Sequence, residues 1–106
     1  MLCTPDNPRG ERGGTVTEKQ IETAVCEYAR KKGCWVRKFS SPAHRGVPDR
    51  VFLTPHGRIF FIEFKRPGGK LSKLQEREIR EIKSRGGYAD VVWDIAMGKA
   101  LVDQHL

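Results

Sequence analysis

The sequence has few cysteines, and their spacing argues against both a zinc site and a disulfide framework. Cys3, Cys26 and Cys34 are odd in number and form no C-x-x-C pair. Zinc sites and disulfide scaffolds use paired cysteines at characteristic spacings, so neither is expected here. We expect all three thiols to be chemically inert, with Cys26 and Cys34 packing as small hydrophobic side chains.

Long apolar runs are also missing. The longest, from Ile59 to Ile62, is only strand-sized, whereas a membrane-spanning helix needs about 20 apolar residues. The first residues contain no apolar segment of the kind that a signal peptide requires. We therefore expect a cytoplasmic protein.

The first 14 residues have little that could be buried. They hold two prolines and three glycines, a composition typical of a flexible arm. Residues 15–106 are enough for one domain with a modest core and too few for two. We therefore predict an N-terminal arm over residues 1–14 and a single domain over residues 15–106, without internal repeats.

Acidic residues are outnumbered by basic ones. Twenty Lys and Arg against thirteen Asp and Glu give a net charge of +7 on a 12.1 kDa chain. Nucleic acid is the natural partner of such a protein, because basic side chains displace condensed counterions from phosphates. A merely basic and well-solvated surface is the alternative, and charge alone decides nothing about catalysis.

The apolar pattern predicts an α/β fold. Helical spacing of apolar residues begins after Thr17, which with Gln20 forms a capping box, and a second box joins Ser72 and Gln75. We expect Leu74, Ile79 and Ile82 to form the buried side of the second helix. The expected elements are a helix over 18–32, strands over 34–39, 49–53 and 58–65, a helix from 73 to the Gly86-Gly87 pair, a strand over 88–92, and a short helix after Asp94 that buries Ile95, Met97, Ala100 and Leu101.

This α-β-β-β-α-β order, followed by the short helix, implies a mixed central sheet flanked by helices. In the strand over 58–65, Glu63 and Lys65 share one face, because side chains alternate across a strand. The preceding strand joins it through a short turn, and hairpin pairing places Asp49 across from about Glu63 to Lys65. Two carboxylates and a lysine therefore meet at one end of the sheet.

Such a cluster suits a hard cation such as Mg²⁺. The ion would polarise a phosphodiester and activate water, with Lys65 orienting the water or stabilising the developing negative charge. Mn²⁺ could substitute, because it accepts the same oxygen ligands. The alternative is an Asp-Lys-Glu salt-bridge cluster without metal.

These residues also carry a family resemblance. Gly46-Val47-Pro48-Asp49, then Gly57, Ile62-Glu63-Phe64-Lys65, Leu71-Ser72 and Gln75 resemble the virus-type replication-repair nuclease (VRR-Nuc) family of the PD-(D/E)xK nuclease superfamily. The resemblance covers about residues 17–93. It implies a PD-(D/E)xK nuclease-like core. The isolated PD…ExK pattern is weak, whereas the whole string is much more specific.

The resemblance implies roles for individual residues. Asp49 and Glu63 would bind the metal, with the backbone carbonyl of Phe64 as a third ligand. Lys65 would be the catalytic lysine, and Gln75 matches a glutamine that the family carries on a helix near the site. A plain capping role for Gln75 is the alternative, and one residue could serve both roles.

The family also uses an acidic residue on the first helix. Glu18 and Glu22 both lie along one border of the apolar stripe. We choose Glu22, because it lies further into the helix and its distance to Gly33 resembles that in related junction resolvases. Glu18 stays open, and both could be solvated surface acids.

Basic residues near the proposed site are candidates for contacts with DNA phosphates, which position a substrate without reading its sequence. Trp35 and Trp93 could stack on bases, yet packing in the core or an interface is their expected use. The candidate phosphate contacts are Arg37, Lys38, Arg45, Arg66 and Lys70.

The resulting hypothesis is a Mg²⁺-dependent, structure-selective endodeoxyribonuclease that cuts branched DNA such as Holliday junctions during DNA repair. Two symmetric nicks across a junction need two active sites, so this version requires a homodimer. The resemblance also suggests a phage or prophage origin, and so a nucleoid-associated protein or one in the cytoplasm of an infected host. The rivals are a sequence-specific restriction-type nuclease and a non-catalytic basic DNA-binding module.

Overall fold

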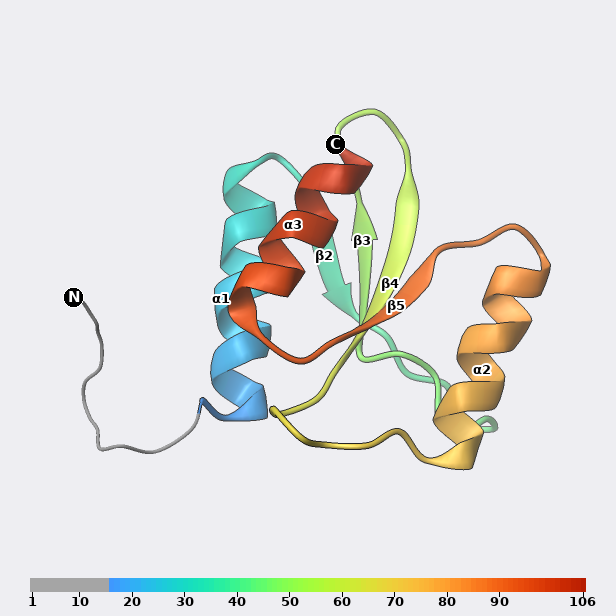
Figure 1. Cartoon of the computed structure of the whole chain (residues 1–106). Coiled ribbons are helices and arrows are strands. Elements are labelled where there is room, and N and C mark those ends of the chain that lie inside the picture. Colours follow the sequence, from blue (N-terminus) through green and yellow to red (C-terminus); the bar gives the residue numbers. More distant parts are fainter. Residues whose placement is uncertain (1–15) are drawn as a thin grey trace.

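The computed structural model describes residues 16–106, so the predicted arm over residues 1–14 lies outside the described part of the chain. The described residues form an α/β domain in the predicted order of elements (Figure 1). The elements are α1 (Glu18–Lys31), β2 (Trp35–Lys38), β3 (Arg50–Leu53), β4 (Ile59–Phe64), α2 (Lys73–Ser84), β5 (Ala89–Val92) and α3 (Ile95–His105).

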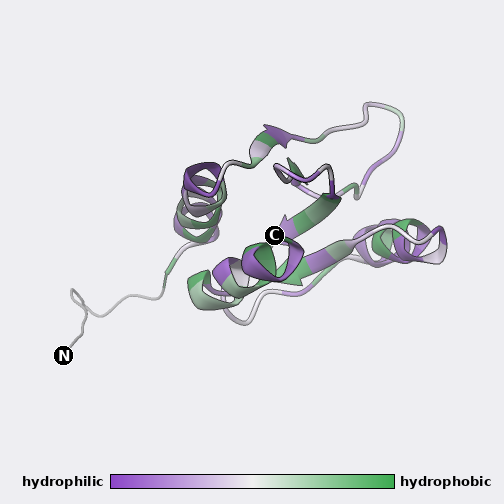
Figure 2. Cartoon of the chain, turned by 90° about the horizontal axis from the view of Figure 1, so that it is seen from above, coloured by the Kyte–Doolittle hydropathy of each residue, from purple (hydrophilic) through white to green (hydrophobic). Residues whose placement is uncertain are grey.

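The four strands form one mixed sheet in the order β2-β3-β4-β5. The first two pairs are antiparallel and β4 pairs with β5 in parallel, with α2 in the connection. Helices α1 and α3 pack on one face of the sheet, and α2 lies on the other side, next to β5 (Figures 1 and 2). The predicted mixed sheet flanked by helices is confirmed.

The core lies between the sheet and the α1–α3 layer. Phe60, Ile62 and Phe64 point from β4 into it and are almost fully buried, because alternate residues of a strand share a face. Phe60 stacks on Phe52 of β3 with ring centroids 4.8 Å apart. From α1 the core receives a stripe at helical spacing that includes Ile21, as the apolar pattern predicts. Strand β4 is therefore central, and the end of it that carries Glu63 is fixed by a packed core.

Both predicted capping boxes are present. The Thr17 hydroxyl accepts from the Gln20 N–H and the Ser72 hydroxyl accepts from the Gln75 N–H, each at 3.1 Å. The two glutamine side chains return the bond to the backbone N–H groups of Thr17 and Ser72, at 2.9 Å and 2.8 Å. These boxes fix where α1 and α2 begin.

Three packing predictions for the later helices are wrong. Leu74 lies in the first turn of α2 and is 40% exposed, while Ile79 is the buried residue of that helix. In α3, Met97 and Ala100 are exposed. The physical reason in α3 is Gly98: a Cβ at this residue would lie 2.4 Å from a methyl carbon of Val25, so the helices approach through a residue without a side chain.

Cys26 and Cys34 are buried free thiols. Burial raises the pKa of each, so both stay protonated at neutral pH and pack as hydrophobic groups, as expected. Among the described residues, no helix has the length and apolar character needed to cross a membrane.

Candidate active site

The antiparallel pairing of β3 with β4 brings Asp49 and Glu63 together. Arg50 lies opposite Ile62 in this pair, so the residue before β3, Asp49, falls opposite Glu63. One carboxylate oxygen of Asp49, Oδ2, accepts a hydrogen bond from the Phe64 N–H at 2.8 Å. The predicted juxtaposition across the hairpin is therefore present, and a backbone donor fixes the Asp49 side chain.

Glu63 is a charged side chain in a nearly closed environment, with 3% of the residue exposed. Its Oε2 accepts a hydrogen bond from Gln75 Nε2 at 2.8 Å and lies 3.8 Å from Lys65 Nζ. Its Oε1 is buried and has no hydrogen-bond partner among the described residues. A buried acceptor left without a partner costs about 1–3 kcal/mol of stability. This oxygen therefore does not stabilise the fold and is free to bind a ligand.

The pKa values of both carboxylates are raised. Burial, followed by the nearby charge of Asp49, raises the pKa of Glu63 to about 7, while Lys65 opposes the shift. Burial also raises the pKa of Asp49, partly offset by the hydrogen bond from the Phe64 N–H. Two acids that resist ionisation side by side attract a cation, because a positive ion between them removes both costs.

Gln75 caps α2 and also contacts Glu63. Its Oε1 accepts from the Ser72 N–H in the capping box, while its Nε2 donates to Glu63. The start of α2 is therefore tied to the acidic pair by one side chain. The same bond fixes the rotamer of Glu63 and leaves Oε1 as the free oxygen.

The loop before Asp49 approaches α2 closely at the same point. Gly46 has a φ of +88°, and a Cβ there would lie 2.7 Å from the backbone carbonyl carbon of Leu74. Only glycine fits both the backbone conformation and the contact. The loop that ends in Asp49 therefore packs tightly against the start of α2. This contact fixes the position of Gln75 relative to Asp49.

On α1, Glu22 forms an ion pair that the sequence did not predict. Its Oε2 lies 2.6 Å from Nε of Arg50, and both side chains are mostly buried. Its charge raises the pKa of Asp49, as does that of Glu18, and Glu18 also raises the pKa of Glu63. Glu22 is thus paired rather than freely solvated, and both acids lie close enough to the site to influence its charge.

Arg50 is the residue that sequence reasoning missed. Its position directly after Asp49, on the strand that carries the acid, was the available signal. The bond to Glu22 needs a contact between α1 and β3 that periodicity does not reveal. Arg50 holds the helix-borne acid Glu22 in one orientation.

All five predicted phosphate contacts have exposed side chains, as contacts with a polyanion require. Two of them, Arg66 and Lys70, lie in the loop after β4. Trp93 Nε1 donates to the Gly69 carbonyl of this loop at 2.9 Å and so holds it beside the site. The other three, Arg37, Lys38 and Arg45, lie in β2 and the loop that follows it.

Metal ligands were predicted as two carboxylates and one backbone carbonyl. Within residues 16–106, no group of three or more His, Cys, Asp or Glu side chains is arranged to hold a metal ion. The predicted set does not need such a group, since its third ligand is the Phe64 carbonyl. The unpartnered Glu63 Oε1 and the raised pKa values of both acids fit a cation at this place.

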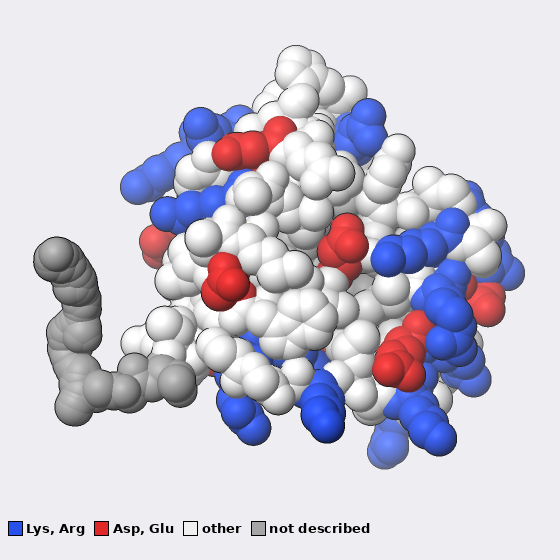
Figure 3. Space-filling model, viewed as in Figure 1, with Lys and Arg blue, Asp and Glu red and all other residues white. Residues whose placement is uncertain are grey.

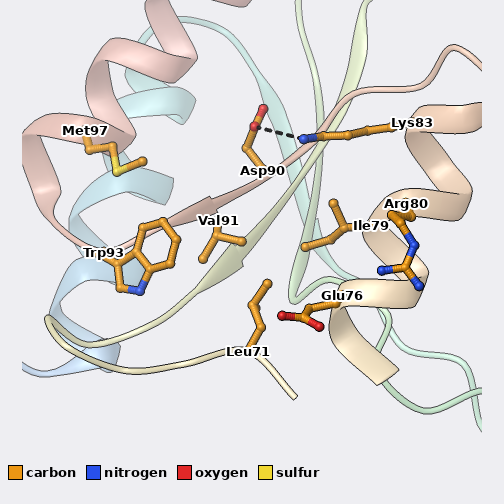
Figure 4. Close-up of a pocket in the computed structure, with 9 residues that line it drawn as sticks. All are labelled: Leu71, Glu76, Ile79, Arg80, Lys83, Asp90, Val91, Trp93 and Met97. Carbon is orange, nitrogen blue, oxygen red and sulfur yellow. Dashed lines mark ion pairs between the residues drawn. The ribbon is translucent and has the colours of Figure 1, made fainter. Parts of the chain in front are cut away.

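A separate groove of about 530 Å³ runs between α2 and β5 (Figure 4). Trp93 and Met97 flank it, and Lys83 of α2 pairs with Asp90 of β5 at 3.9 Å across it. None of the predicted catalytic side chains lines it. In Figure 3, Lys and Arg gather over α2, interleaved with acids, as expected for a solvated helix face.

Comparison with known proteins decides the family. Residues 13–93 match the VRR-NUC domain family. The chain belongs to this family. A relative described as "Putative nuclease p44", from Acyrthosiphon pisum secondary endosymbiont phage 1, is 44% identical over 63 residues, which are 59% of this chain and 68% of that protein.

Solved structures agree with this assignment. One described as a VRR_NUC domain superposes with a TM-score of 0.78 at 27% identity, covering 86% of this chain and 100% of the other. A second, described as a VRR_NUC domain protein, gives a TM-score of 0.72 at 18% identity over 87% of this chain and 89% of the other, and shows the fold alone. The VRR-NUC domain described here is a nuclease, and DNA is the substrate that such a domain implies.

Proposed function

We propose that this VRR-NUC protein is a Mg²⁺-dependent endodeoxyribonuclease that hydrolyses phosphodiester bonds in branched DNA. The observation that carries the proposal is the pairing of half-buried Asp49 with buried Glu63, whose Oε1 has no hydrogen-bond partner among the described residues. A fold gains no stability from a second buried acid beside the first. Such a pair is useful when a cation and a phosphate bind between them.

The proposed ligands of the ion are Asp49, Glu63 and the Phe64 carbonyl, and Mn²⁺ would also fit these oxygen donors. The chemistry supplied by a bound ion is polarisation of the phosphodiester and a lower pKa for water. The protein's own contribution is to hold the donors. The Phe64 N–H fixes Asp49 at 2.8 Å, and Gln75 fixes Glu63 at 2.8 Å.

Lys65 is the proposed catalytic lysine. Its Nζ lies 3.8 Å from Glu63 Oε2, and its side chain is only 19% exposed, so its charge is little screened by water. From this place it would orient the attacking water or stabilise the negative charge that develops on the phosphate. Glu22, held by Arg50, is the proposed acid from α1, with Glu18 as the alternative.

Branched DNA, such as a Holliday junction processed in DNA repair, is the proposed substrate class. Symmetric cutting across a junction needs two sites, so we propose a homodimer for this activity. We further propose a phage or prophage protein that acts in the cytoplasm, at the nucleoid or in an infected host. The similarity to a phage protein supports the origin.

The test is an incubation of the protein with labelled four-way junctions, flaps and plain duplex, each with Mg²⁺, with Mn²⁺ and with EDTA. We expect cleavage only with metal, a preference for branched substrates, and a loss of at least about 100-fold in Lys65→Ala. Light scattering in the same buffer reports whether the protein is a dimer. The matched control is Lys31→Ala, which removes the same charge from an exposed residue in the last turn of α1.

The outcomes separate the rival functions. If all substrates survive while the protein still retards DNA in a salt-dependent manner, the chain is a binding module and the nuclease proposal fails. Cutting of plain duplex at one sequence would identify a restriction-type enzyme. Equal losses in Lys65→Ala and Lys31→Ala would show that only general charge matters.

A further inference from the structure

The sheet face opposite α1 and α3 carries an exposed apolar row at the hairpin end. The strand register aligns Trp35 with Leu53 and Leu53 with Ile59, so these side chains lie side by side across β2, β3 and β4. Trp35 is 47% exposed and Ile59 is 51% exposed. Of the two uses expected for Trp35, packing in the core is therefore wrong, and packing in an interface stays a prediction. We call these three residues the Trp35 row.

The row is open because α2 lies beside β5, at the other edge of the same face. The helices of residues 16–106 leave β2 and β3 uncovered there (Figure 2). A large indole on an open sheet face gains little from folding, since it stays in contact with water. The exposed position of Trp35 therefore points to a binding partner on this face of the sheet.

The Trp35 row is continuous with the candidate active site. Glu63 and Ile59 lie on the same face of β4, and four residues at about 3.3 Å each put them roughly 13 Å apart. Phe61 lies between them and packs on Phe39 with ring centroids 5.3 Å apart. Trp35 lies two strands further across the sheet, at about 4.8 Å per strand, which puts it roughly 16 Å from Glu63. A stacked strand rises about 3.4 Å per nucleotide, so about five nucleotides span this distance.

The positive charge of Arg37, next to the Trp35 row, favours a polyanion as the binding partner. Arg37 shares the sheet face of Trp35, because alternate residues of a strand point the same way. The Arg37 guanidinium lies 4.6 Å from the centroid of the Trp35 ring and donates to the Val36 carbonyl at 2.8 Å. The indole therefore lies beside a positive charge that is itself fixed by a backbone hydrogen bond. A neutral apolar partner would gain nothing from this cation.

We infer that Trp35 is a stacking platform for an unpaired base of the DNA substrate, a few nucleotides from the bond that is cut. A base in an intact duplex has both faces covered by its neighbours, whereas a base at a flap, gap or open junction has a free face. Stacking of a base on an aromatic side chain contributes about 1–3 kcal/mol. The inference rests on the proposed nuclease function. It explains the proposed preference of the enzyme for branched DNA, because a base at a flap, gap or open junction has a free face.

The experiment measures binding in EDTA, so that no substrate is cut, for a flap, a gapped duplex and an intact duplex. In Trp35→Ala we expect roughly 5- to 150-fold weaker binding to the flap and the gapped duplex, the fold-change that 1–3 kcal/mol gives. Binding to intact duplex should change by less than about twofold, and Trp35→Phe should recover most of the loss, because it keeps an aromatic face.

The matched control is Tyr88→Ala. Tyr88 is 45% exposed and has the Arg58 guanidinium 5.1 Å from its ring centroid, so it is the same kind of aromatic–arginine pair outside the Trp35 row. We expect this variant to bind all three substrates as the unchanged protein does. Fluorescence adds a direct readout, because the chain has only two tryptophans. Single-stranded DNA should quench the unchanged protein more strongly than Trp35→Phe, which retains only Trp93.

Equal weakening for all three substrates, or no weakening, would overturn the inference. So would a change of oligomeric state in Trp35→Ala at unchanged DNA affinity, which would assign the row to a second copy of the chain. Failure of the nuclease proposal is recognised separately. In that case no substrate is cut in Mg²⁺, while selective binding to unpaired bases persists.

Discussion

Gln75 donates a hydrogen bond from Nε2 to Oε2 of Glu63 at 2.8 Å while its Oε1 caps the first turn of α2. A single side chain therefore joins the start of a helix to the buried acid at the end of β4. This arrangement makes the geometry of the candidate site depend on the position of α2. It also allows the capping role and the positioning role of Gln75 to be separated by mutation.

We predict that Gln75→Ala lowers the cleavage rate by about 10- to 100-fold, the usual effect of removing a group that orients a metal ligand. Ser72→Ala is the matched control, because it removes the Ser72 hydroxyl from the same capping box and leaves the bond to Glu63. Both variants should lose about 1 kcal/mol of folding stability. Rates and thermal melts of the two variants check this, and equal rates in both would assign Gln75 to capping alone.

Glu63→Gln should abolish cleavage and yet stabilise the fold near pH 8. The pKa of about 7 in the folded protein lies above the ordinary value of 4.5, so the fold favours the protonated acid. The contribution of Glu63 to stability is therefore full below pH 4.5 and is lost as the pH rises through about 7. Glutamine resembles the protonated acid at every pH and escapes this loss.

The measurement is the free energy of unfolding of both proteins between pH 4 and pH 9 in EDTA. The difference between the two curves isolates Glu63, because Asp49 and Lys65, which also act on it, are present in both. Adding Mg²⁺ at pH 8 should raise the melting temperature of the unchanged protein only. Glu27→Gln, at an exposed residue of α1, is the control. Destabilisation by Glu63→Gln at pH 8 would instead indicate a structural ion pair.

The features that were predicted correctly from the sequence are set by residues that lie close together in the chain. The short turn with Gly57 set the register that brings Asp49 opposite Glu63, and two capping boxes gave the helix starts. Alternation along β4 identified both of its faces. These features depend on residues close in sequence, so one chain was enough to predict them.

Features that depend on what covers a surface were not predicted. Trp35 was expected in the core or an interface, and it is exposed because no described helix covers its face. The buried side of α3 was misassigned because Gly98, which carries no apolar signal, makes the close contact with α1. The Arg50–Glu22 pair joins residues 28 apart in sequence through tertiary packing. In each case the sequence does not show which element or side chain packs against the residue.

The close approach of Gly46 to α2 leads to the last prediction. Gly46→Ala meets two obstacles: a φ of +88° and a Cβ 2.7 Å from the backbone of Leu74. Backbone cannot move aside as a flexible side chain can, so α2 must shift and take Gln75 away from Glu63. We expect a loss of about 1–3 kcal/mol of stability together with a loss of at least about 10-fold in cleavage rate.

Gly57→Ala separates these two effects. Gly57 has the same φ of +88°, but nothing lies within 4 Å of a Cβ there. It should lose about 1 kcal/mol through backbone strain and cut DNA at nearly the unchanged rate, because the hairpin turn lies at the far end of β4 from Glu63. Chemical unfolding and cleavage assays on both variants provide the check. If Gly46→Ala also kept its rate, the contact between the loop and α2 would be a matter of folding alone, and the position of α2 would not govern Glu63.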